Sequence, residues 1–158
     1  MTKYELGSWD LKSIKPTDIS KEIEEINELV SELEKKRNEL NENVSSEDFM
    51  KFIKEFEIFE TKTSKLYGYV SLKFSEDSSD HEIAALKTQV EQLIAEISNK
   101  LLFFSLWFKD LSDEKANELI KSSGDYHYFL ESIRKTKPYT LTELEEKIIN
   151  IKDVTGYN

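Results

Sequence analysis

The sequence contains no cysteine, only four glycines and only two prolines in 158 residues. Without cysteine the chain can form neither a disulfide bond nor a thiolate metal site, which is compatible with a reducing cytoplasm. The shortage of glycine and proline leaves little material for turns, so long helices are favoured over a many-stranded sheet. The composition therefore predicts an all-α fold.

Long hydrophobic runs and an excess of positive charge are also missing. The longest apolar stretch, Leu101 to Phe108, is interrupted by Ser105 and is far shorter than the roughly 20 residues of a membrane span. The first five residues contain no apolar run, so we expect no signal peptide. With 22 basic and 32 acidic side chains the net charge is −10, which phosphate backbones repel. We expect a soluble, cytoplasmic protein that binds neither nucleic acid nor membrane.

What the sequence does contain is apolar residues that recur at steps of three and four, the pattern of amphipathic helices. Three long stripes follow helix-capping residues, which are Thr17 or Asp18, Ser45 or Ser46, and the capping box of Ser79 with Glu82. The first stripe is interrupted at Arg37. Short breaks between helices indicate that consecutive helices pack as antiparallel neighbours. The prediction is an antiparallel helical bundle dominated by two or three long helices.

Shorter C-terminal helices complete this fold prediction. One helix follows Ser112, another covers Asp125 to Lys135, and Pro138 ends it. The last runs from Leu141 to about Lys152, is opened by a capping pair of Thr140 with Glu143, and stops by Gly156.

Two segments of the predicted bundle are ambiguous. Tyr67 to Phe74 also fits the alternation of a strand, and Gly68 weakens a helix by about 1 kcal/mol. Helix is favoured there because the apolar stripe continues through the segment. Leu101 to Phe108 is apolar nearly all round and needs neighbours on several sides. We expect either self-association through this region or partial disorder of the short C-terminal helices, because large exposed apolar patches usually mark interfaces.

The two histidines are the candidates for a zinc site. His81 and Glu82 half-resemble the zinc-protease motif, but that motif needs a second histidine one helical turn later, where this chain has Ala85. His127 lies between two tyrosines and is interpreted as a packing or surface residue. The sequence therefore offers no catalytic, metal-binding or cofactor-binding residue, and its substrate-binding residues are unknown.

Two further clusters have structural interpretations. Glu76, Asp77 and Asp80 lack the regular ligand spacing and the glycine of a calcium loop, so a solvated turn is favoured. The aromatic residues of segments 49–59 and 103–108 are more typical of a core than of a ligand pocket. No phosphate-binding loop or nucleophile elbow occurs in the sequence.

Three stretches together carry a resemblance to a known family. They are Trp9-Asp10-Leu11, Tyr69-Val70-Ser71-Leu72 with Asp77, and Tyr128 to Gly156 with Leu130, Arg134, Pro138, Leu141, Glu143, Glu145, Glu146 and Lys147. The last stretch resembles the segment ahead of the catalytic domain in oligoendopeptidase F, a zinc metallopeptidase of the thimet type. Tyr139 departs from the pattern, because many members are expected to have histidine at that position.

The resemblance implies a division of the chain and a function. Residues 1–136 would be an N-terminal helical domain, and residues 137–158 would lead into a catalytic domain that is absent from this chain. In the family, the front domain helps to wall the cavity that holds zinc, so that only short peptides are cleaved. The zinc ligands and the general base belong to a downstream His-Glu-x-x-His helix and a further glutamate. The resemblance therefore implies an inactive chain without a cofactor, whose partners are the downstream catalytic domain and, for the parent enzyme, short peptides.

A second interpretation stays open. The chain could be a stand-alone helical module, without enzymatic activity, that binds a partner helix through its apolar seam. The reading frame beyond Asn158 discriminates the two. A stop codon favours the binding module, and several hundred further residues with the zinc motif favour the peptidase.

Overall fold

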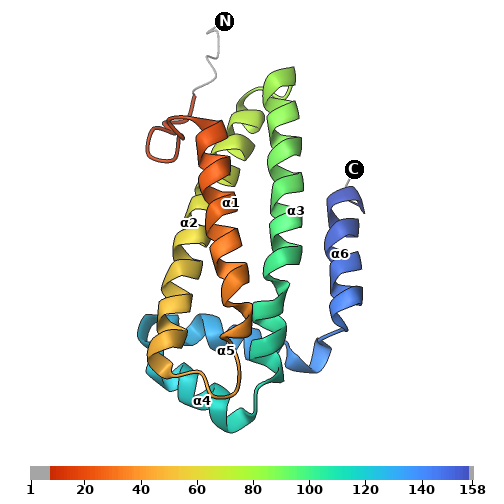
Figure 1. Cartoon of the computed structure of the whole chain (residues 1–158). Helices are drawn as coiled ribbons and strands as arrows, with labels where there is room; N and C mark the ends of the chain where they lie inside the picture. Colours follow the sequence, from red (N-terminus) through yellow and green to blue (C-terminus); the bar gives the residue numbers. More distant parts are fainter. Residues whose placement is uncertain (1–7, 157–158) are drawn as a thin grey trace, which may run out of the picture.

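The computed structural model describes residues 8–156, and side chains as far as residue 152. The described chain contains six α-helices and no strand, which confirms the all-α prediction (Figure 1). The helices are α1 (Ile19–Lys35), α2 (Ser46–Glu76), α3 (His81–Asp110), α4 (Asp113–Ser122), α5 (His127–Lys135) and α6 (Glu143–Gly156). Three short 3₁₀ segments lie between them, namely η1 (Lys36–Asn38), η2 (Gly124–Tyr126) and η3 (Lys137–Tyr139).

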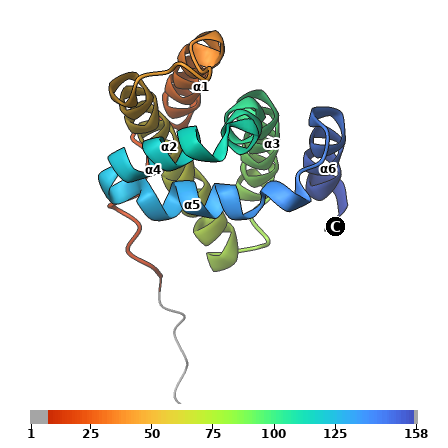
Figure 2. The same ribbon diagram turned by 90° about the horizontal axis from the view of Figure 1, so that it is seen from below.

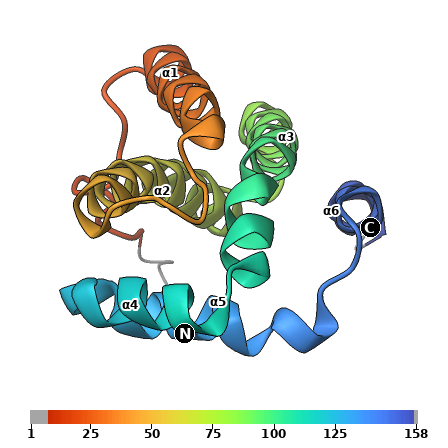
Figure 3. The same cartoon turned by 60° about the horizontal axis from the view of Figure 1, so that its bottom comes forward.

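The first three helices form the body of the molecule. Figure 1 shows α1, α2 and α3 side by side and alternating in direction, which confirms the predicted antiparallel bundle of long helices. The two shorter helices α4 and α5 instead run across the end of this bundle, as Figures 2 and 3 show. The chain then turns upward into α6, which lies outside the bundle and packs mainly against α3. The fold is thus a three-helix bundle with a crossing base and one outer helix.

Helix starts follow the capping chemistry of the sequence in three places. The Asp18 side chain accepts the backbone N–H of Lys21 at 3.1 Å, and so caps α1. Ser45 accepts from Asp48 at 3.0 Å for α2, and Ser112 caps α4. These caps lie at predicted positions, because a short side-chain oxygen there satisfies an N–H that the helix itself leaves free.

The predicted cap of α3 is wrong by one residue. Asp80, not Ser79, accepts the backbone N–H groups of Glu82 at 2.9 Å and Ile83 at 3.1 Å. The Ser79 hydroxyl donates to Asp77 instead. A carboxylate at the N-terminus is a stronger acceptor than a hydroxyl and also complements the helix dipole.

The predicted cap of α6 is displaced by two residues. The capping box is Thr142 with Glu145, in which the Glu145 carboxylate accepts the Thr142 N–H at 2.9 Å. Thr140 is not available to cap α6, because its hydroxyl donates to the carbonyl of Thr136 at 3.3 Å and its N–H to that of Lys137. Because Thr140 is engaged in the η3 turn, the helix begins later in the chain, at Glu143.

The segment Tyr67–Phe74 is helical, as favoured. It lies inside α2, and Leu66, Tyr69 and Val70 are buried at helical spacing. The side chain of Ile14 approaches Gly68. The Cδ1 atom of Ile14 lies 4.0 Å from the position that a Cβ would occupy if Gly68 carried a side chain.

The apolar segment Leu101–Phe108 finds the neighbours that it needs. Leu101, Phe103, Phe104 and Phe108 are all buried in the core. The Phe104 ring lies 5.1 Å from Phe52 of α2, and the Phe108 ring stacks on Phe49 at 5.8 Å. Leu102, Leu106 and Trp107 are half-buried, so helices of the same chain cover most of the segment. Self-association through it stays a prediction.

At the other end of the described chain, Trp9 is not a packing anchor. Its side chain is exposed, and its backbone N–H donates to Glu76 at 2.7 Å. Leu11 and Ile14 pack against the core in its place. Their smaller side chains turn inward within the turn that precedes α1.

Candidate functional site

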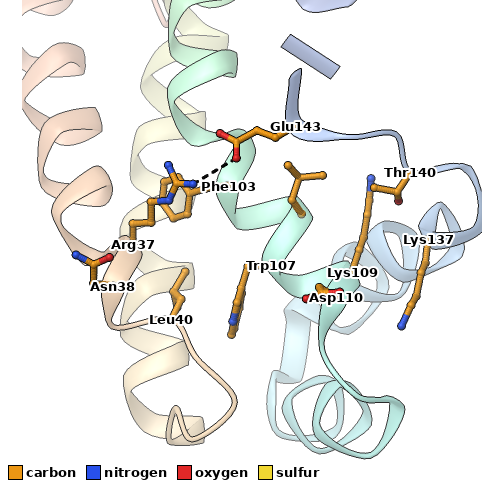
Figure 4. Close-up of a pocket in the computed structure, with 11 residues that line it drawn as sticks. Arg37, Asn38, Leu40, Phe103, Trp107, Lys109, Asp110, Lys137, Thr140 and Glu143 are labelled. Atoms are coloured by element: carbon orange, nitrogen blue, oxygen red, sulfur yellow. Dashed lines mark hydrogen bonds and ion pairs between the residues drawn. The ribbon is translucent and has the colours of Figure 1, made fainter. Parts of the chain in front are cut away.

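A groove opens between the end of α1, the C-terminal half of α3 and the connection into α6 (Figure 4). Its volume is ≈ 670 Å³. The lining residues come from segments far apart in the sequence, and they are Arg37, Asn38, Leu40, Phe103, Leu106, Trp107, Lys109, Asp110, Lys137, Thr140 and Glu143. The groove exists because α6 stands apart from α1 and touches the bundle mainly along α3.

An ion pair crosses the groove. The Arg37 guanidinium lies 3.5 Å from the Glu143 carboxylate and 5.5 Å above the centre of the Phe103 ring, as Figure 4 shows for the ion pair. Lys147 holds the other Glu143 oxygen at 2.7 Å. The pKa of Glu143 is lowered, first by the hydrogen bond from Lys147 and further by Arg37. The interaction ties the first turn of α6 to η1, and it keeps Glu143 ionised.

Trp107 links the groove to the aromatic core. Its ring lies 6.0 Å from Phe49 and 6.3 Å from Phe104. The indole Nε1 is buried and has no hydrogen-bond acceptor among the described residues. A buried donor without a partner costs stability, so the tight aromatic packing must compensate for it.

The charges around the groove are mixed. Lys109 and Lys137 lie on one side, with Asp110 beside them. The Lys137 ammonium reaches the carbonyl of Leu111 at 3.4 Å. The lining residues contain no pair of nucleophile and base at hydrogen-bonding distance in the described chain. The groove therefore presents apolar and charged groups side by side.

Arg134 fixes α5 to the end of α3. One of its guanidinium nitrogens, Nη1, donates to the backbone carbonyls of Phe108 at 3.0 Å, Lys109 at 2.7 Å and Leu111 at 3.0 Å. The other terminal nitrogen pairs with Asp113. A cation at this position satisfies carbonyls that the last turn of a helix leaves free and complements the helix dipole. Arg134 is thus a structural clamp.

The structure separates the two histidines. His81 opens α3 at one end of the bundle, whereas His127 opens α5, which crosses the other end. His127 is held by a contact of Nδ1 with the Ile120 carbonyl at 3.4 Å and by Glu131, 3.3 Å from Nε2. The sequence interpretation overlooked Glu131, although its spacing of four residues was the available signal.

The acidic residues of the α2–α3 turn are engaged within the protein. Glu76 accepts from Lys73 at 2.6 Å as well as from Trp9, and Asp77 accepts from Ser79. These hydrogen bonds lower the pKa of both carboxyl groups. Over the residues that the structure describes, no group of three or more potential ligands could hold a metal ion. The absence of a zinc site from the whole chain stays a prediction.

The comparison with known families adds one finding. Residues 107–158, about a third of the chain, match the model of the peptidase M3 N-terminal family, described as oligopeptidase F. The match supports an N-terminal domain of an oligoendopeptidase-type peptidase. No curated protein and no solved structure matches the chain.

The oligopeptidase F match begins at Trp107 and includes the Arg134 clamp, α4, α5 and α6. The resembling stretch Tyr128 to Gly156 lies inside it, whereas the other two resembling stretches lie outside. Six of the eleven lining residues belong to the matched segment, and the other five come from η1, from Leu40 just after it and from the preceding part of α3. None of the described helices combines the length and the apolar character that a membrane span requires.

Proposed function

We propose that this chain is the non-catalytic N-terminal domain of a zinc-dependent oligoendopeptidase that hydrolyses short peptides, and that it helps to wall and close the substrate cavity. The observation that carries the proposal is the oligopeptidase F match over residues 107–158, on an all-helical fold. In this proposal the zinc, its ligands and the general base reside in a downstream domain of the same polypeptide in the cytoplasm. Residues 1–136 form the helical domain, and residues 137–158 lead into the catalytic part.

The fold is suited to a wall that moves as one body. The aromatic residues of α2 and α3 interlock, with Phe52 and Phe56 both close to Phe104. The Arg134 clamp fastens the matched segment to α3. Closure of such a domain excludes water and oversized chains from a metal site, which strengthens electrostatic interactions there. The acidic surface would face outward, because a cavity wall with so much negative charge repels peptide carboxyl termini.

The test compares the complete enzyme encoded by the reading frame with a deletion of residues up to Lys135. Zinc content and the cleavage rates of a series of peptides of increasing length are measured on both, with circular dichroism to check folding. We expect bound zinc in both proteins, slower cleavage of short peptides by the deletion, and weaker rejection of longer ones. Unchanged rates and an unchanged length preference in a folded deletion would contradict the proposed role.

A further inference from the structure

Helix α6 faces the bundle with its polar side. Its half-buried residues are Glu143, Glu146, Lys147 and Asn150. Leu144, Ile148 and Ile151 of α6, and Leu141 just before it, lie on the other side, with exposed fractions of 70%, 55%, 58% and 44%. We call these four residues the α6 stripe. An amphipathic helix at a protein surface normally buries its apolar side against the core, so α6 has the reverse orientation.

Polar contacts hold α6 in this orientation. The Asn150 side chain donates to Asn99 of α3 at 3.0 Å. The Glu143 carboxylate lies 3.5 Å from Arg37 beyond the groove. These contacts lie on one side of α6, and among the residues that the structure describes the α6 stripe stays exposed. A contiguous row of large aliphatic side chains in water usually marks an interface.

The spacing of the α6 stripe is compatible with a helix as its partner. Its residues follow one another at steps of three, four and three, which is the seam of a helix that packs along another helix. The same spacing would fit any apolar surface, because it follows from the geometry of α6 itself. A helix with its own row of apolar residues is the occupant that matches the all-helical fold of the described chain.

The charges indicate the chemistry of that helix. The first turn of α6 carries Glu143, Glu145 and Glu146, and the whole chain has a net charge of −10. A second copy of the chain would bring the same charge, which opposes its approach. Glu143 and Glu146 lie on the bundle side of α6, where Glu143 pairs with Arg37 and Lys147 and Glu146 accepts the Leu141 N–H. Glu145 is exposed, so Glu145 and the net charge of the chain would attract a helix with lysine or arginine beside its apolar row.

We infer that the α6 stripe is the docking surface for a helix of the catalytic part of the same polypeptide, with an apolar seam flanked by lysine or arginine. The inference rests on the proposed function, and the oligopeptidase F match includes all of α6. The helix that links the two parts would thereby be clamped between them, by its polar side to α3 and by its apolar side to the catalytic part.

The absence of cysteine permits a direct test by thiol labelling. Ile148→Cys places a thiol in the α6 stripe, and Ile58→Cys is a matched control on α2, where the isoleucine is 51% exposed. Labelling rates at each position are measured by mass spectrometry in the 158-residue chain and in the complete polypeptide. In the chain alone, both thiols should react at similar rates. In the complete polypeptide, labelling of Ile148→Cys should slow by about tenfold or more, with Ile58→Cys unchanged. High salt should reduce this protection, since the flanking charges contribute to it.

The outcomes separate the inference from the proposed function. Equal labelling of Ile148→Cys in both proteins, in a polypeptide that cleaves peptides, would overturn the docking surface and leave the peptidase assignment intact. Protection at Ile148→Cys in a polypeptide without peptidase activity would contradict the catalytic part as the occupant and the proposed function together. Labelling of the isolated chain that slows with its concentration would show that a second copy occupies the stripe, which also overturns the inference.

Discussion

The α1–α3 bundle and α6 use the same kind of amphipathic sequence in opposite ways. In α1, the apolar residues Ile26, Val30 and Leu33 are buried. In α6, the residues of the stripe are exposed and the polar side contacts α3. The bundle therefore completes its own core, whereas α6 is half of an interface. An apolar stripe indicates that a helix packs against a partner, but it does not indicate whether that partner lies within the same chain.

The largest expected difference between the two regions concerns stability. Phe108→Ala should lower the free energy of unfolding of the chain by about 3–5 kcal/mol, because Phe108 is fully buried and its removal leaves a cavity. Ile148→Ala should change it by less than about 0.5 kcal/mol, because this side chain is mostly in water. Denaturant unfolding followed by circular dichroism measures both. A loss of several kcal/mol in Ile148→Ala would show that the stripe is buried within the chain.

The next largest effect should come from Arg134, which fixes α5 to the end of α3 in the bundle. Arg134→Ala removes the side-chain donor of the Phe108 and Lys109 carbonyls and leaves the Leu111 carbonyl and Asp113 with Lys137 only, so the chain should lose about 2–3 kcal/mol of stability. Lys135→Ala is the matched control, since it removes a neighbouring, exposed cation of the same helix, which lies 5.9 Å from the Tyr128 ring. Its effect should stay below about 0.5 kcal/mol. Similar losses for the two variants in the same unfolding experiment would contradict the clamp.

The bundle could be predicted from the sequence because its rules are local. Stripes at three- and four-residue steps gave the long helices, and Asp18, Ser45 and Ser112 gave three of their starts. The errors at α3 and α6 arose where two side chains compete to cap one helix. At α3, the Asp80 carboxylate caps the helix in place of Ser79. At α6, the η3 turn before the helix moves the cap further along the chain. Competition of this kind depends on geometry that residue types alone do not contain.

The groove could not be predicted, because its lining residues lie far apart in the sequence. Arg37 and Glu143 are separated by 106 positions and meet only after α3 has brought η1 and α6 together. The reversed orientation of α6 could not be foreseen either, since periodicity defines an apolar side without assigning its neighbour. The resemblance at Tyr128 to Gly156 was visible because Arg134 and Pro138 lie close together in the chain, and the oligopeptidase F match includes it.

A smaller effect is expected from an ion pair within the bundle. Lys62 of α2 donates to Glu25 at 2.6 Å and to Glu22 at 3.1 Å, both of α1. The hydrogen bond from Lys62 lowers the pKa of Glu25 below its usual 4.5. The stabilisation is therefore present above pH 4.5 and is lost as the pH falls through the lower pKa of the folded state.

Lys62→Met should accordingly destabilise the chain slightly at neutral pH and have no effect in strong acid. Lys54→Met is the control, because Lys54 is an exposed lysine of the same helix. Thermal unfolding of both variants at neutral and acid pH measures the difference. A destabilisation by Lys62→Met that does not depend on pH would show that the loss comes from side-chain packing instead.

The most direct test of the contrast between bundle and α6 is amide hydrogen exchange of the 158-residue chain. The contacts of α6 with the bundle include the polar ones of Asn150 and Glu143, whereas α3 is buried along the aromatic core. We expect the amides of residues 147–152 in α6 to exchange by local opening, orders of magnitude faster than those of residues 101–108 in α3, which should require global unfolding. Protection of α6 equal to that of α3 in the monomeric chain would contradict the account, because α6 would then need no further partner.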